Sequence, residues 1–360
     1  MKKTDEKKKV LHIVEAFGAG VFSFLVDLIK YTKEDFDITV AYGIRKETAE
    51  NFEEYFSDNV RLIKVENFTR EINPKKDFKA VTEIKKIIKE LNPDIIHLHS
   101  SKAGIIGRLS ANGRKTKMLY NPHGFSFLKK DDSRLKRFIY KSIEKIATIN
   151  KCTIVGCSEG EYAEALSLSN NAININNGID IEDINTMNLM PKTEDKSKPV
   201  ICTLARISYS KNPEIFNDIS KEFSDLKFIW IGDGELRERL TSENIEITGW
   251  KEKEEALEIL NNCDIFILPS LWEGLPISLL EAMYLKKLCI VSNVIGNKDV
   301  IQNNRNGFVC NSLEEYINTI NKVLEQKVDL EGIKNNAYED ILNEYNTKKM
   351  AEEYIEEYKK

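Results

Sequence analysis

The chain has 360 residues, of which 41% are hydrophobic and 31% charged, with 8 prolines and 17 glycines. This is the composition of a globular protein long enough for two domains, and it excludes a disordered or collagen-like chain. Residues 1–180 carry 31 Lys and Arg against 25 Asp and Glu, whereas residues 181–360 carry 22 Lys and Arg against 33 Asp and Glu. The basic first half indicates contact with an anionic partner. Because its basic residues are not interleaved with aromatic residues, as they are in nucleic-acid-binding modules, we expect no nucleic-acid partner.

The first residues, MKKTDEKKKVLHIVEAFGAG, place a basic run before an apolar stretch and so imitate a signal peptide. His12 and Glu15 interrupt the apolar stretch, and an amphipathic segment follows, which predicts a strand, a loop and a helix instead. We therefore expect no signal peptide, and we find no apolar run of about 20 residues that could span a bilayer. The predicted loop Gly18-Ala19-Gly20 would allow a phosphate or an acceptor to approach the backbone closely.

Short apolar runs alternate with helical patterns from one end of the chain to the other. Strands are predicted at Val10–Val14, Ile38–Tyr42, Val60–Val65, Ile95–Leu98, Lys117–Tyr120, Cys152–Cys157, Val200–Ala205, Lys227–Ile231, Ile245–Thr248, Ile265–Pro269 and Leu288–Ser292. Helical periodicity marks Phe78–Leu91, Arg134–Ile149, Glu254–Asn261 and Ile277–Leu285. This alternation predicts an α/β protein with parallel, doubly wound sheets.

The six cysteines lie mostly within apolar runs and form no CxxC pair: Cys152, Cys157, Cys202, Cys263, Cys289 and Cys310. This pattern is typical of buried reduced thiols rather than of disulfides or a metal site. It favours a reducing compartment, such as the cytoplasm.

A domain boundary is predicted at the polar segment MNLMPKTEDKSKP, which contains two prolines and precedes a new buried strand. We expect a Rossmann-like domain over residues 1–186, a linker over 187–199 and a second Rossmann-like domain over 200–345. Residues 346–360 form a predicted amphipathic helix that covers the second domain or crosses back to the first. The two domains would face a central cleft between the carboxyl ends of their sheets, where ligands bind in such folds.

Several chemically distinctive residues follow the predicted strands of the second domain. Arg206 and Lys211 share one loop, and because Arg offers paired hydrogen bonds and Lys a mobile charge, the two suit a diphosphate. The alternative is a pair of solvated cations. A Gly-Asp-Gly turn at 232–234 would let a backbone or a ligand come close, and Trp250 after Gly249 would carry a nucleotide base or pack on the surface.

The stretch PSLWEGLPISLLEAM, at 269–283, ends one apolar run and begins a helix. The start of a helix presents free N–H groups and positive potential, which suit a phosphate. Glu273 lies before this helix start and Glu281 inside the helix. Taken alone, Glu273 would be a carboxylate that the helix dipole stabilises, and Glu281 would be a solvated side chain.

Two patterns imitate metal sites. Asp35-Phe36-Asp37 has the spacing of the Asp-x-Asp motif in metal-dependent transferases, but it opens a predicted strand without supporting residues. His97-x-His99 has the form of a ligand pair without an evident third ligand, which favours packing at a strand end. We therefore predict no metal site.

Taken in order, these features resemble the donor-binding half of retaining GT-B glycosyltransferases of family 4. The resemblance is carried by Arg206 and Lys211, the Gly-Asp-Gly turn, Gly249, Pro269-Ser270 and Glu273-x7-Glu281. In the first half, DIIHLHSSKAGIIGRL, NPHGFSF, CSEGEYA and INNGID are similar to recurring stretches of the same family, so the resemblance covers nearly the whole chain. HSSKAG followed by PHGFSF also resembles bacterial enzymes of capsule, O-antigen and exopolysaccharide assembly.

The resemblance implies how the second domain would hold a nucleotide sugar. Arg206 and Lys211 would bind the donor diphosphate, near the N–H groups of Gly274 and Leu275. Glu281 would bind the ribose hydroxyls, and the base would lie near Gly249 and Trp250. No metal or other cofactor is implied, because two cations and a helix start would stabilise the leaving diphosphate.

The resemblance also implies the catalytic residues. Glu273 would accept hydrogen bonds from the donor sugar, and His123 would approach the sugar from the other domain unless it only caps its own loop. Retention would follow from front-face attack, with a donor phosphate oxygen helping to take the acceptor proton. The family's first loop often carries an acidic and a basic residue after two glycines, and the segment Gly18–Phe22 lacks both.

The segment FLKKDDSRLKRFIYKSIEKI, at 127–146, is basic and has an apolar stripe. The stripe consists of Leu135, Phe138, Ile139, Ile143 and Ile146. It resembles an interfacial helix that contacts an anionic membrane; the alternative is a structural helix with a solvated basic face.

The resemblance therefore predicts transfer of a sugar, from a UDP-sugar in preference to other donors, to a glycan or lipid-linked acceptor. The reaction would belong to bacterial surface polysaccharide synthesis, in the cytoplasm or at the inner face of the plasma membrane. The alternatives are a nucleotide-sugar epimerase of the same fold and a catalytically inactive partner subunit.

Overall fold

The computed structural model describes residues 7–17, 19–44, 48, 51–69, 73–187, 189 and 198–360. It divides the chain into two compact units. Unit 1 comprises residues 1–128, 132–177 and 347–360, and unit 2 comprises residues 129–131 and 178–346. Residues 178–186, which we expected in the first domain, thus belong to unit 2, and most of the expected linker (188 and 190–197) lies outside the described residues.

Unit 1 is built on a seven-stranded sheet whose strand order is β3-β2-β1-β4-β5-β6-β7. The strands are β1 (Lys9–Val14), β2 (Asp37–Tyr42), β3 (Arg61–Lys64), β4 (Ile95–His99), β5 (Lys117–Asn121), β6 (Thr153–Gly156) and β7 (Ala172–Asn174). All neighbouring strands are parallel. The strand order reverses between β1 and β4, which is the usual place for a ligand in such a sheet.

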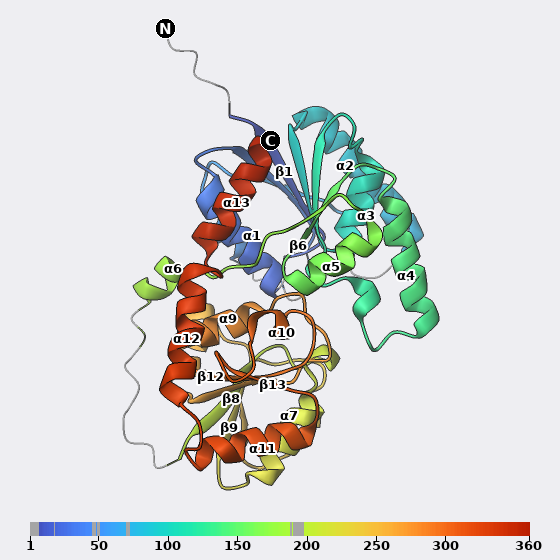
Figure 1. Ribbon diagram of the computed structural model, residues 1–360. Helices are drawn as coiled ribbons and strands as arrows, with labels where there is room; N and C mark the ends of the chain where they lie inside the picture. The colour runs from blue at the N-terminus through green and yellow to red at the C-terminus, as the bar shows by residue number, and fades with distance from the viewer. Residues whose placement is uncertain are drawn as a thin grey trace. The chain divides into compact units, whose positions relative to one another are not determined.

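Helices cover both faces of this sheet. They are α1 (Ala19–Thr32), α2 (Pro74–Leu91), α3 (Ser101–Ser110), α4 (Arg134–Ala147), α5 (Glu159–Leu168) and α13 (Thr347–Lys359). The apolar side chains of α1 and α13 share one hydrophobic core, and those of α2, α3 and α5 share the other. The C-terminal helix α13 therefore belongs to unit 1, where it runs beside α1 (Figure 1).

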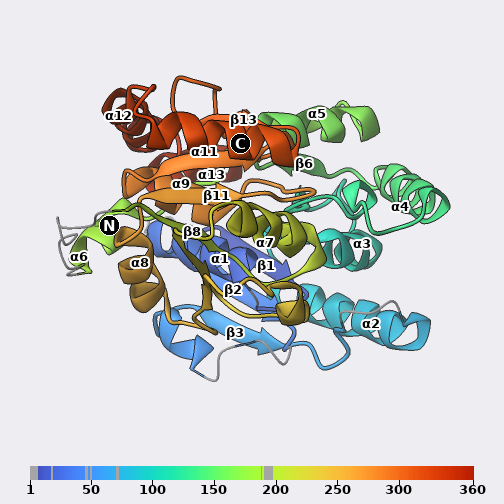
Figure 2. The same ribbon diagram turned by 90° about the horizontal axis from the view of Figure 1, so that it is seen from below.

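Unit 2 repeats the same plan with six parallel strands in the order β10-β9-β8-β11-β12-β13. The strands are β8 (Val200–Leu204), β9 (Lys227–Ile231), β10 (Ile245–Ile247), β11 (Ile265–Leu268), β12 (Leu288–Ser292) and β13 (Phe308–Cys310). Here the order reverses between β8 and β11, which run side by side (Figure 2). The predicted pair of Rossmann-like sheets is confirmed, and the cleft between them stays a prediction.

The helices of unit 2 are α6 (Ile181–Thr186), α7 (Pro213–Glu222), α8 (Lys253–Asn261), α9 (Ile277–Tyr284), α10 (Asn297–Val300), α11 (Leu313–Leu324) and α12 (Leu330–Asn343). The buried residues of α7 and α11 share one core with the sheet. Leu257 of α8 and Leu279 of α9 are also buried, and both helices contact the strands. Local signals set the helix starts: Ser312, for example, accepts a hydrogen bond from Glu315 N at the start of α11.

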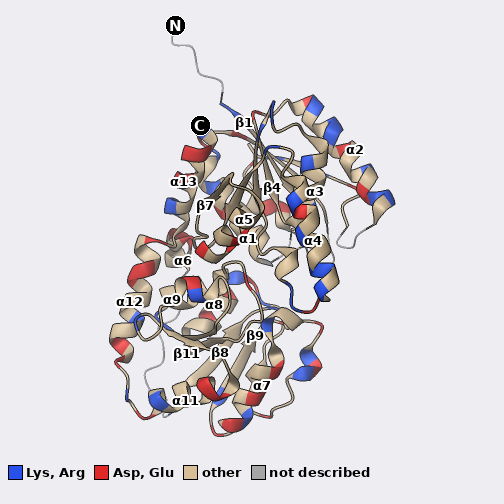
Figure 3. Cartoon of the chain, turned by 45° about the vertical axis from the view of Figure 1, so that its right-hand side comes forward, with Lys and Arg blue, Asp and Glu red and all other residues tan. Residues whose placement is uncertain are grey.

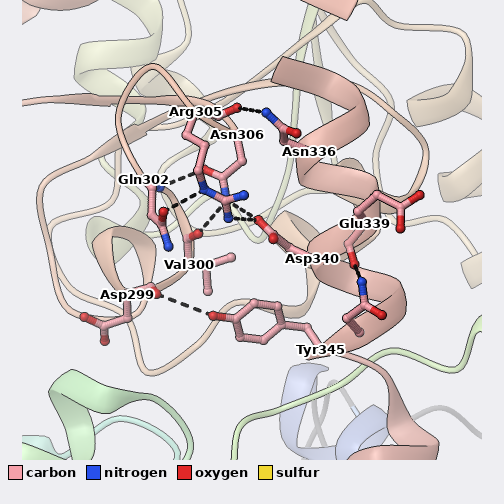
Figure 4. Close-up of polar contacts among 10 residues, drawn as sticks. Asp299, Val300, Gln302, Arg305, Asn306, Asn336, Glu339, Asp340 and Tyr345 are labelled. Carbon is pink, nitrogen blue, oxygen red and sulfur yellow. Dashed lines mark hydrogen bonds and ion pairs between the residues drawn. The ribbon is translucent and has the colours of Figure 1, made fainter. Parts of the chain in front are cut away.

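The loop between α10 and β13 is fixed to α12 by a polar cluster (Figure 4). The Asn306 amide donates to Asp340 Oδ2 at 2.6 Å and to Val300 O at 2.9 Å. Arg305 forms an ion pair with Asp340, and Asn336 donates to Arg305 O at 2.9 Å. These contacts hold the end of α10 and the loop that follows it on α12.

All six cysteines are buried and unbonded, as their positions in apolar runs predict. Burial raises the pKa of the Cys152 thiol to about 12 and that of Cys310 to about 11. Among the described residues, no helix has the length and apolar character that crossing a bilayer requires.

Candidate active site

The candidate site of unit 2 lies where the carboxyl ends of β8 and β11 meet, at the reversal of strand order. The loop after β8 carries Arg206 and Lys211, and the loop after β11 carries Glu273. The two loops are joined directly, because Leu271 N donates to Ser210 O at 2.8 Å. The parallel topology therefore brings together residues that are more than 60 positions apart in the sequence.

Lys211 and Glu273 form an ion pair at the centre of this arrangement. Lys211 Nζ lies 2.5 Å from Glu273 Oε1, and the Ser270 hydroxyl donates to the same oxygen at 2.5 Å. Both charged side chains are largely shielded, with 19% of Lys211 and 11% of Glu273 exposed. The pair is thus held in place, and a bound anion would compete with the carboxylate for the lysine.

Ser270 is in turn held by hydrogen bonds from a hydroxyl and an amide group. The Ser292 hydroxyl, at the end of β12, donates to Ser270 O at 2.5 Å, and the Asn297 amide donates to Ser292 Oγ at 3.1 Å. Asn297 is fully buried. These residues tie the loop that carries Glu273 to the ends of two neighbouring strands.

Arg206 lies on the same loop as Lys211 but has a different partner. Its Nε donates to Glu235 Oε2 at 2.9 Å, and both side chains remain partly exposed. Glu235 follows the Gly-Asp-Gly turn, which packs on the backbone of the Arg206 loop: a Cβ on Gly232 would lie 2.3 Å from Ala205 O, and one on Gly234 would lie 2.2 Å from Ile207 O. The glycine pair therefore serves the approach of another backbone.

Helix α9 begins at Ile277, and Pro276 occupies the N-cap position. The preceding residues Gly274 and Leu275 lie next to the turn before α10, since a Cβ on Gly296 would lie 2.2 Å from Gly274 O. Gly296 has a φ of +83°, which a residue with a side chain rarely adopts. The approach to the helix start is thus shaped by a second loop that the sequence does not reveal.

Glu281 is buried within α9, with 7% of its surface exposed, so it is not the solvated side chain of the simpler interpretation. Burial raises the pKa of the Glu281 carboxyl; the nearby Lys253 opposes this rise, and Asp183 adds to it. Lys253 Nζ is itself paired with Asp183 Oδ2 at 2.7 Å. A buried carboxylate beside a cation is a suitable acceptor for hydroxyl groups.

Gly249 and Trp250 follow β10. Gly249 pairs with Gly232 in an isolated antiparallel bridge, which places it beside the Gly-Asp-Gly turn. Trp250 is 62% exposed, so it is not packed on the surface, whereas Trp230 is fully buried. An exposed indole beside the site can stack on a planar ring.

In unit 1, His123 follows β5 in a loop with unusual backbone geometry. His123 has a φ of +51° and Gly124 one of +95°. The loop is fixed by the fully buried Glu161, which accepts from Gly124 N at 2.6 Å and from Cys157 N at 2.9 Å. The His123 ring packs edge-on against Phe24, with centroids 4.7 Å apart.

The four histidines of the chain form one cluster in unit 1. His12 of β1 and His97 of β4 lie opposite each other in the register of the two strands. His99 lies two residues after His97 on β4, on the same face of the sheet. His12, His97 and His99 lie close enough together to act as three metal ligands. His12 is therefore a candidate third ligand beside His97 and His99, which the sequence alone does not indicate. Burial lowers the pKa of His97 to about 4 and lowers the pKa of His12 and His99 as well, which keeps these rings neutral.

All ring nitrogen atoms of His97 and His99, and Nδ1 of His12, are already engaged in hydrogen bonds. His97 Nε2 lies 2.6 Å from Asn121 Oδ1, and His97 Nδ1 lies 2.6 Å from the Tyr358 hydroxyl. His12 Nδ1 lies 3.0 Å from His99 Nε2. A metal ion would have to break these contacts, so we interpret the cluster as a hydrogen-bonded network.

Two other predicted features have different structural settings. Ala19 and Gly20 belong to α1 rather than to a loop, because the apolar residues that follow, such as Phe24 and Leu25, bury one face of a helix; Gly18 lies outside the described residues. Asp35 lies in the turn before β2, and its carboxylate lies 3.5 Å from Lys359 Nζ. Asp35 thus has a surface ion-pair partner, and the structural interpretation of the Asp-x-Asp spacing stays a prediction.

Several supporting residues are not evident from the sequence. Glu235, Ser292, Asn297 and Gly296 each act through a partner on another loop. Only their positions at strand ends and helix starts could have indicated them. Glu161 lies within a stretch that carries the family resemblance, but its role in fixing the loop of His123 appears only in the structure.

Comparisons with known proteins identify the family of this chain. The family described as glycosyltransferase family 4 matches residues 18–183, and that described as glycosyl transferases group 1 matches residues 188–340. An Escherichia coli UDP-Gal:alpha-D-GlcNAc-diphosphoundecaprenol alpha-1,3-galactosyltransferase is 31% identical, over 98% of this chain and 97% of the relative.

Two further proteins are similar over nearly their whole length. A Campylobacter jejuni N,N'-diacetylbacillosaminyl-diphospho-undecaprenol alpha-1,3-N-acetylgalactosaminyltransferase is 24% identical, over 95% of this chain and 96% of the relative. The crystal structure of HepE from Anabaena with UDP and glucose superposes with a TM-score of 0.75 at 15% identity, covering 97% of this chain and 99% of HepE. The structural likeness confirms the two-domain fold.

Proposed function

The chain belongs to the family 4 glycosyltransferases with a group 1 domain, and from this premise we propose that it moves a sugar from a UDP-sugar to a lipid-diphosphate-linked acceptor with retention of configuration. The observation that carries the proposal is the 31% identity, end to end, with a UDP-galactose transferase. Both curated relatives are named for alpha-1,3 transfer to a diphosphoundecaprenol-linked sugar. We therefore favour a galactose or N-acetylgalactosamine donor and a step in surface polysaccharide synthesis at the cytoplasmic face of the membrane.

The donor would be held by the loops of unit 2. When the bond between sugar and diphosphate breaks, negative charge grows on the leaving UDP. Arg206 and Lys211 carry fixed positive charges on one loop, and Gly274 and Leu275 precede the N-terminus of α9. Together these groups would stabilise the leaving group electrostatically, without a metal ion.

The carboxylates would serve the hydroxyl groups of the donor. Glu273 is held by Ser270 and Lys211, so its position is defined before a ligand arrives. When a phosphate oxygen attracts Lys211, Glu273 is released to accept from sugar hydroxyls and to orient the reacting carbon. Glu281 would accept hydrogen bonds from the ribose hydroxyls, and Trp250 would stack on the base. His123 of unit 1 would contact the donor sugar.

A lipid-linked acceptor requires that the protein work at a membrane, and α4 has the surface for this. The large apolar residues of α4 point to solvent: Leu135, Phe138, Ile139, Ile143 and Ile146 are between 36% and 69% exposed. The buried residue of α4 is instead the acidic Glu144, which accepts from Arg108 at 2.6 Å and from the Tyr120 hydroxyl at 2.8 Å. The helix is thus attached to unit 1 by these polar groups and by Tyr140, which packs against the core, and it exposes its apolar stripe.

We assign this apolar face to an anionic lipid surface. Helix α4 carries five basic residues against one acidic residue, and its Lys and Arg positions are coloured blue along the ribbon (Figure 3). Exposed apolar side chains that alternate with cations match a bilayer interface, where the apolar groups enter the acyl region and the cations meet anionic headgroups. A protein partner would be expected to bury the stripe without a requirement for negative charge.

The test is transfer in vitro with a panel of UDP-sugars and a polyprenyl-diphosphate-linked N-acetylglucosamine acceptor. We expect a product with one added hexose or N-acetylhexosamine in the α configuration, measured by mass and by the anomeric proton coupling. The variant Glu273→Ala should abolish transfer without unfolding the protein. Near-normal turnover by this variant would remove Glu273 from the mechanism, and no transfer from any UDP-sugar would refute the proposal.

The same assay separates the two alternatives. An epimerase would convert the donor in the absence of any acceptor, so donor alone is incubated and its sugar is identified. An inactive partner subunit would bind UDP without any turnover. The protein keeps Arg206, Lys211, Glu273 and Glu281 in their places, which favours the active enzyme.

A further inference from the structure

The histidine cluster of unit 1 forms a linear chain that ends at His123. His99 is its middle member: His99 Nε2 lies 3.0 Å from His12 Nδ1, and His99 Nδ1 lies 3.2 Å from His123 Nε2. His12 and His99 are fully buried, and the rings of His12 and His99 are stacked, as are those of His99 and His123. The chain thus connects the proposed sugar-contacting residue to the interior of the sheet.

The number of protons on the three imidazole rings restricts the direction of the hydrogen bonds between them. A neutral imidazole has one N–H group and one lone pair, so each ring donates from one nitrogen and accepts at the other. Burial is the main cause that lowers the pKa of all three rings, with His97 adding to the effect on each. The rings are therefore neutral, and the two hydrogen bonds must run in the same direction along the chain.

The buried end of the chain decides the direction. His12 Nε2 is buried and has no hydrogen-bond partner among the described residues. If His99 donated to His12, the proton of His12 would lie on this nitrogen as an orphaned N–H group, which folded proteins rarely contain. The lower-cost arrangement puts the His12 proton on Nδ1, so that His12 donates to His99 and His99 donates to His123.

The neighbouring His97 is fixed separately and in the opposite tautomer. Asn121 Nδ2 donates to the Tyr354 hydroxyl at 2.7 Å, so Asn121 Oδ1 accepts from His97 Nε2. His97 Nδ1 then accepts from the Tyr358 hydroxyl. His97 therefore takes no proton from the chain, and α13, which supplies both tyrosines, closes the network.

We propose that His12 and His99 are positioning residues that fix His123 as a neutral imidazole with its proton on Nδ1. The inference rests on the proposed function, in which His123 contacts the donor sugar. A fixed Nδ1–H group can donate to a sugar hydroxyl oxygen, and the occupied Nε2 cannot act as a base. The chain thus makes His123 a hydrogen-bond donor for the sugar rather than a proton acceptor.

The tautomers can be measured directly, without substrate. The full-length protein labelled with ¹⁵N-histidine gives four imidazole spin systems, because the chain has four histidines. We expect Nδ1–H forms for His12, His99 and His123 and the Nε2–H form for His97. An Nε2–H or doubly protonated His123 at neutral pH overturns the proposal, and so does stoichiometric zinc bound to the cluster in the purified protein.

Two substitutions of His12 test whether the tautomer affects the reaction. In His12→Asn the amide nitrogen replaces Nδ1 as a donor to His99, so His123 should keep its Nδ1–H form and kcat/KM should change by less than about 3-fold. In His12→Leu the donor is lost, His123 should show both tautomers, and kcat/KM should fall about 5- to 10-fold, the usual effect of one neutral hydrogen bond. Equal kcat/KM values for the two variants overturn the proposal.

The result is distinguishable from a failure of the proposed function. If no UDP-sugar is turned over but the wild-type protein shows the expected tautomers, the proposed reaction is wrong and the hydrogen-bond chain remains. If transfer occurs while His123 has its proton on Nε2, the reaction stands and the positioning role is wrong.

Discussion

Lys211 Nζ lies 2.5 Å from Glu273 Oε1, so the proposed diphosphate ligand and the proposed sugar ligand neutralise each other in the absence of a donor. The two side chains come from loops that follow β8 and β11, the neighbouring strands at the reversal of strand order. In the proposed mechanism, donor binding exchanges this ion pair for a lysine–phosphate contact and a carboxylate–hydroxyl contact. We therefore expect the pair to couple the binding of the diphosphate to the release of Glu273.

Glu273→Gln should separate binding from catalysis. Without the competing carboxylate, Lys211 is available to the phosphate, so the affinity for UDP should stay the same or rise a few-fold. Turnover should fall by at least about 100-fold, because the neutral amide is a poorer acceptor for sugar hydroxyls. Calorimetric titration with UDP and the transfer assay measure the two effects.

Lys211→Met, unlike Glu273→Gln, should weaken the binding of UDP. We expect the affinity for UDP to fall about 10- to 100-fold because a charged hydrogen bond is lost. The control is Lys221→Met, which removes an exposed lysine at the end of α7. If Glu273→Gln weakens UDP binding as much as Lys211→Met does, the exchange described above does not occur.

Glu281→Gln should stabilise unit 2 and weaken nucleotide binding. Burial raises the folded-state pKa of Glu281 above its value in the unfolded chain, so its contribution to stability is present below the unfolded value and is lost as pH rises through the folded value. At neutral pH the buried charge is a cost, and the amide should raise the free energy of unfolding by on the order of 1 kcal/mol. At a pH below the unfolded pKa no gain is expected.

All three tryptophans lie in unit 2, so urea unfolding followed by tryptophan fluorescence measures this effect. The affinity of the wild type for UDP should also fall as pH is lowered through the raised pKa, and this dependence should be absent in the variant. Glu254→Gln, at an exposed position of α8, is the control. A destabilised Glu281→Gln variant at neutral pH contradicts the expectation.

Gly296→Ala should displace Glu273 by crowding the loop that carries it. The added Cβ would lie 2.2 Å from Gly274 O and 3.2 Å from Glu273 Cβ, at a backbone φ of +83°. The loop before α9 must shift, which we expect to cost about 1–3 kcal/mol of stability and at least about 10-fold in kcat. Lys298→Ala, exposed on the next turn, should change neither quantity; wild-type kcat in Gly296→Ala would show that the loop adapts freely.

Most of the fold follows from the sequence because buried parallel strands are apolar throughout and their helices are periodic. The strands β7 and β13 are not predicted, and each has only three residues at a sheet edge. The edge strand β10 is equally short, but its alternation of Ile245, Glu246 and Ile247 marks it as a strand. The pairing of Lys211 with Glu273 depends on the order of strands, which local patterns do not encode. The same is true of His12, which reads as an interruption of an apolar strand and becomes the buried end of a hydrogen-bonded chain.

Helix α4 should attach the protein to anionic vesicles, because its exposed stripe can enter the lipid interface. Moving one such side chain out of water is worth about 1.5–3 kcal/mol, so the double variant Leu135→Ser and Phe138→Ser should lower partitioning by about 100-fold or more. Both residues are 69% exposed, so the variant should unfold at the wild-type temperature. Flotation with phosphatidylcholine vesicles, with and without phosphatidylglycerol, measures the partitioning.

The matched control is Phe78→Ser, which removes a phenylalanine that is 74% exposed on the basic helix α2. It should bind vesicles as the wild type does, since α2 has no apolar stripe exposed beside it. Binding that requires phosphatidylglycerol and weakens with salt is the expected wild-type behaviour, because the cations of α4 act within a Debye length of the headgroups. Equal loss in the control and the double variant, or equal binding to neutral vesicles, would refute a specific role for α4.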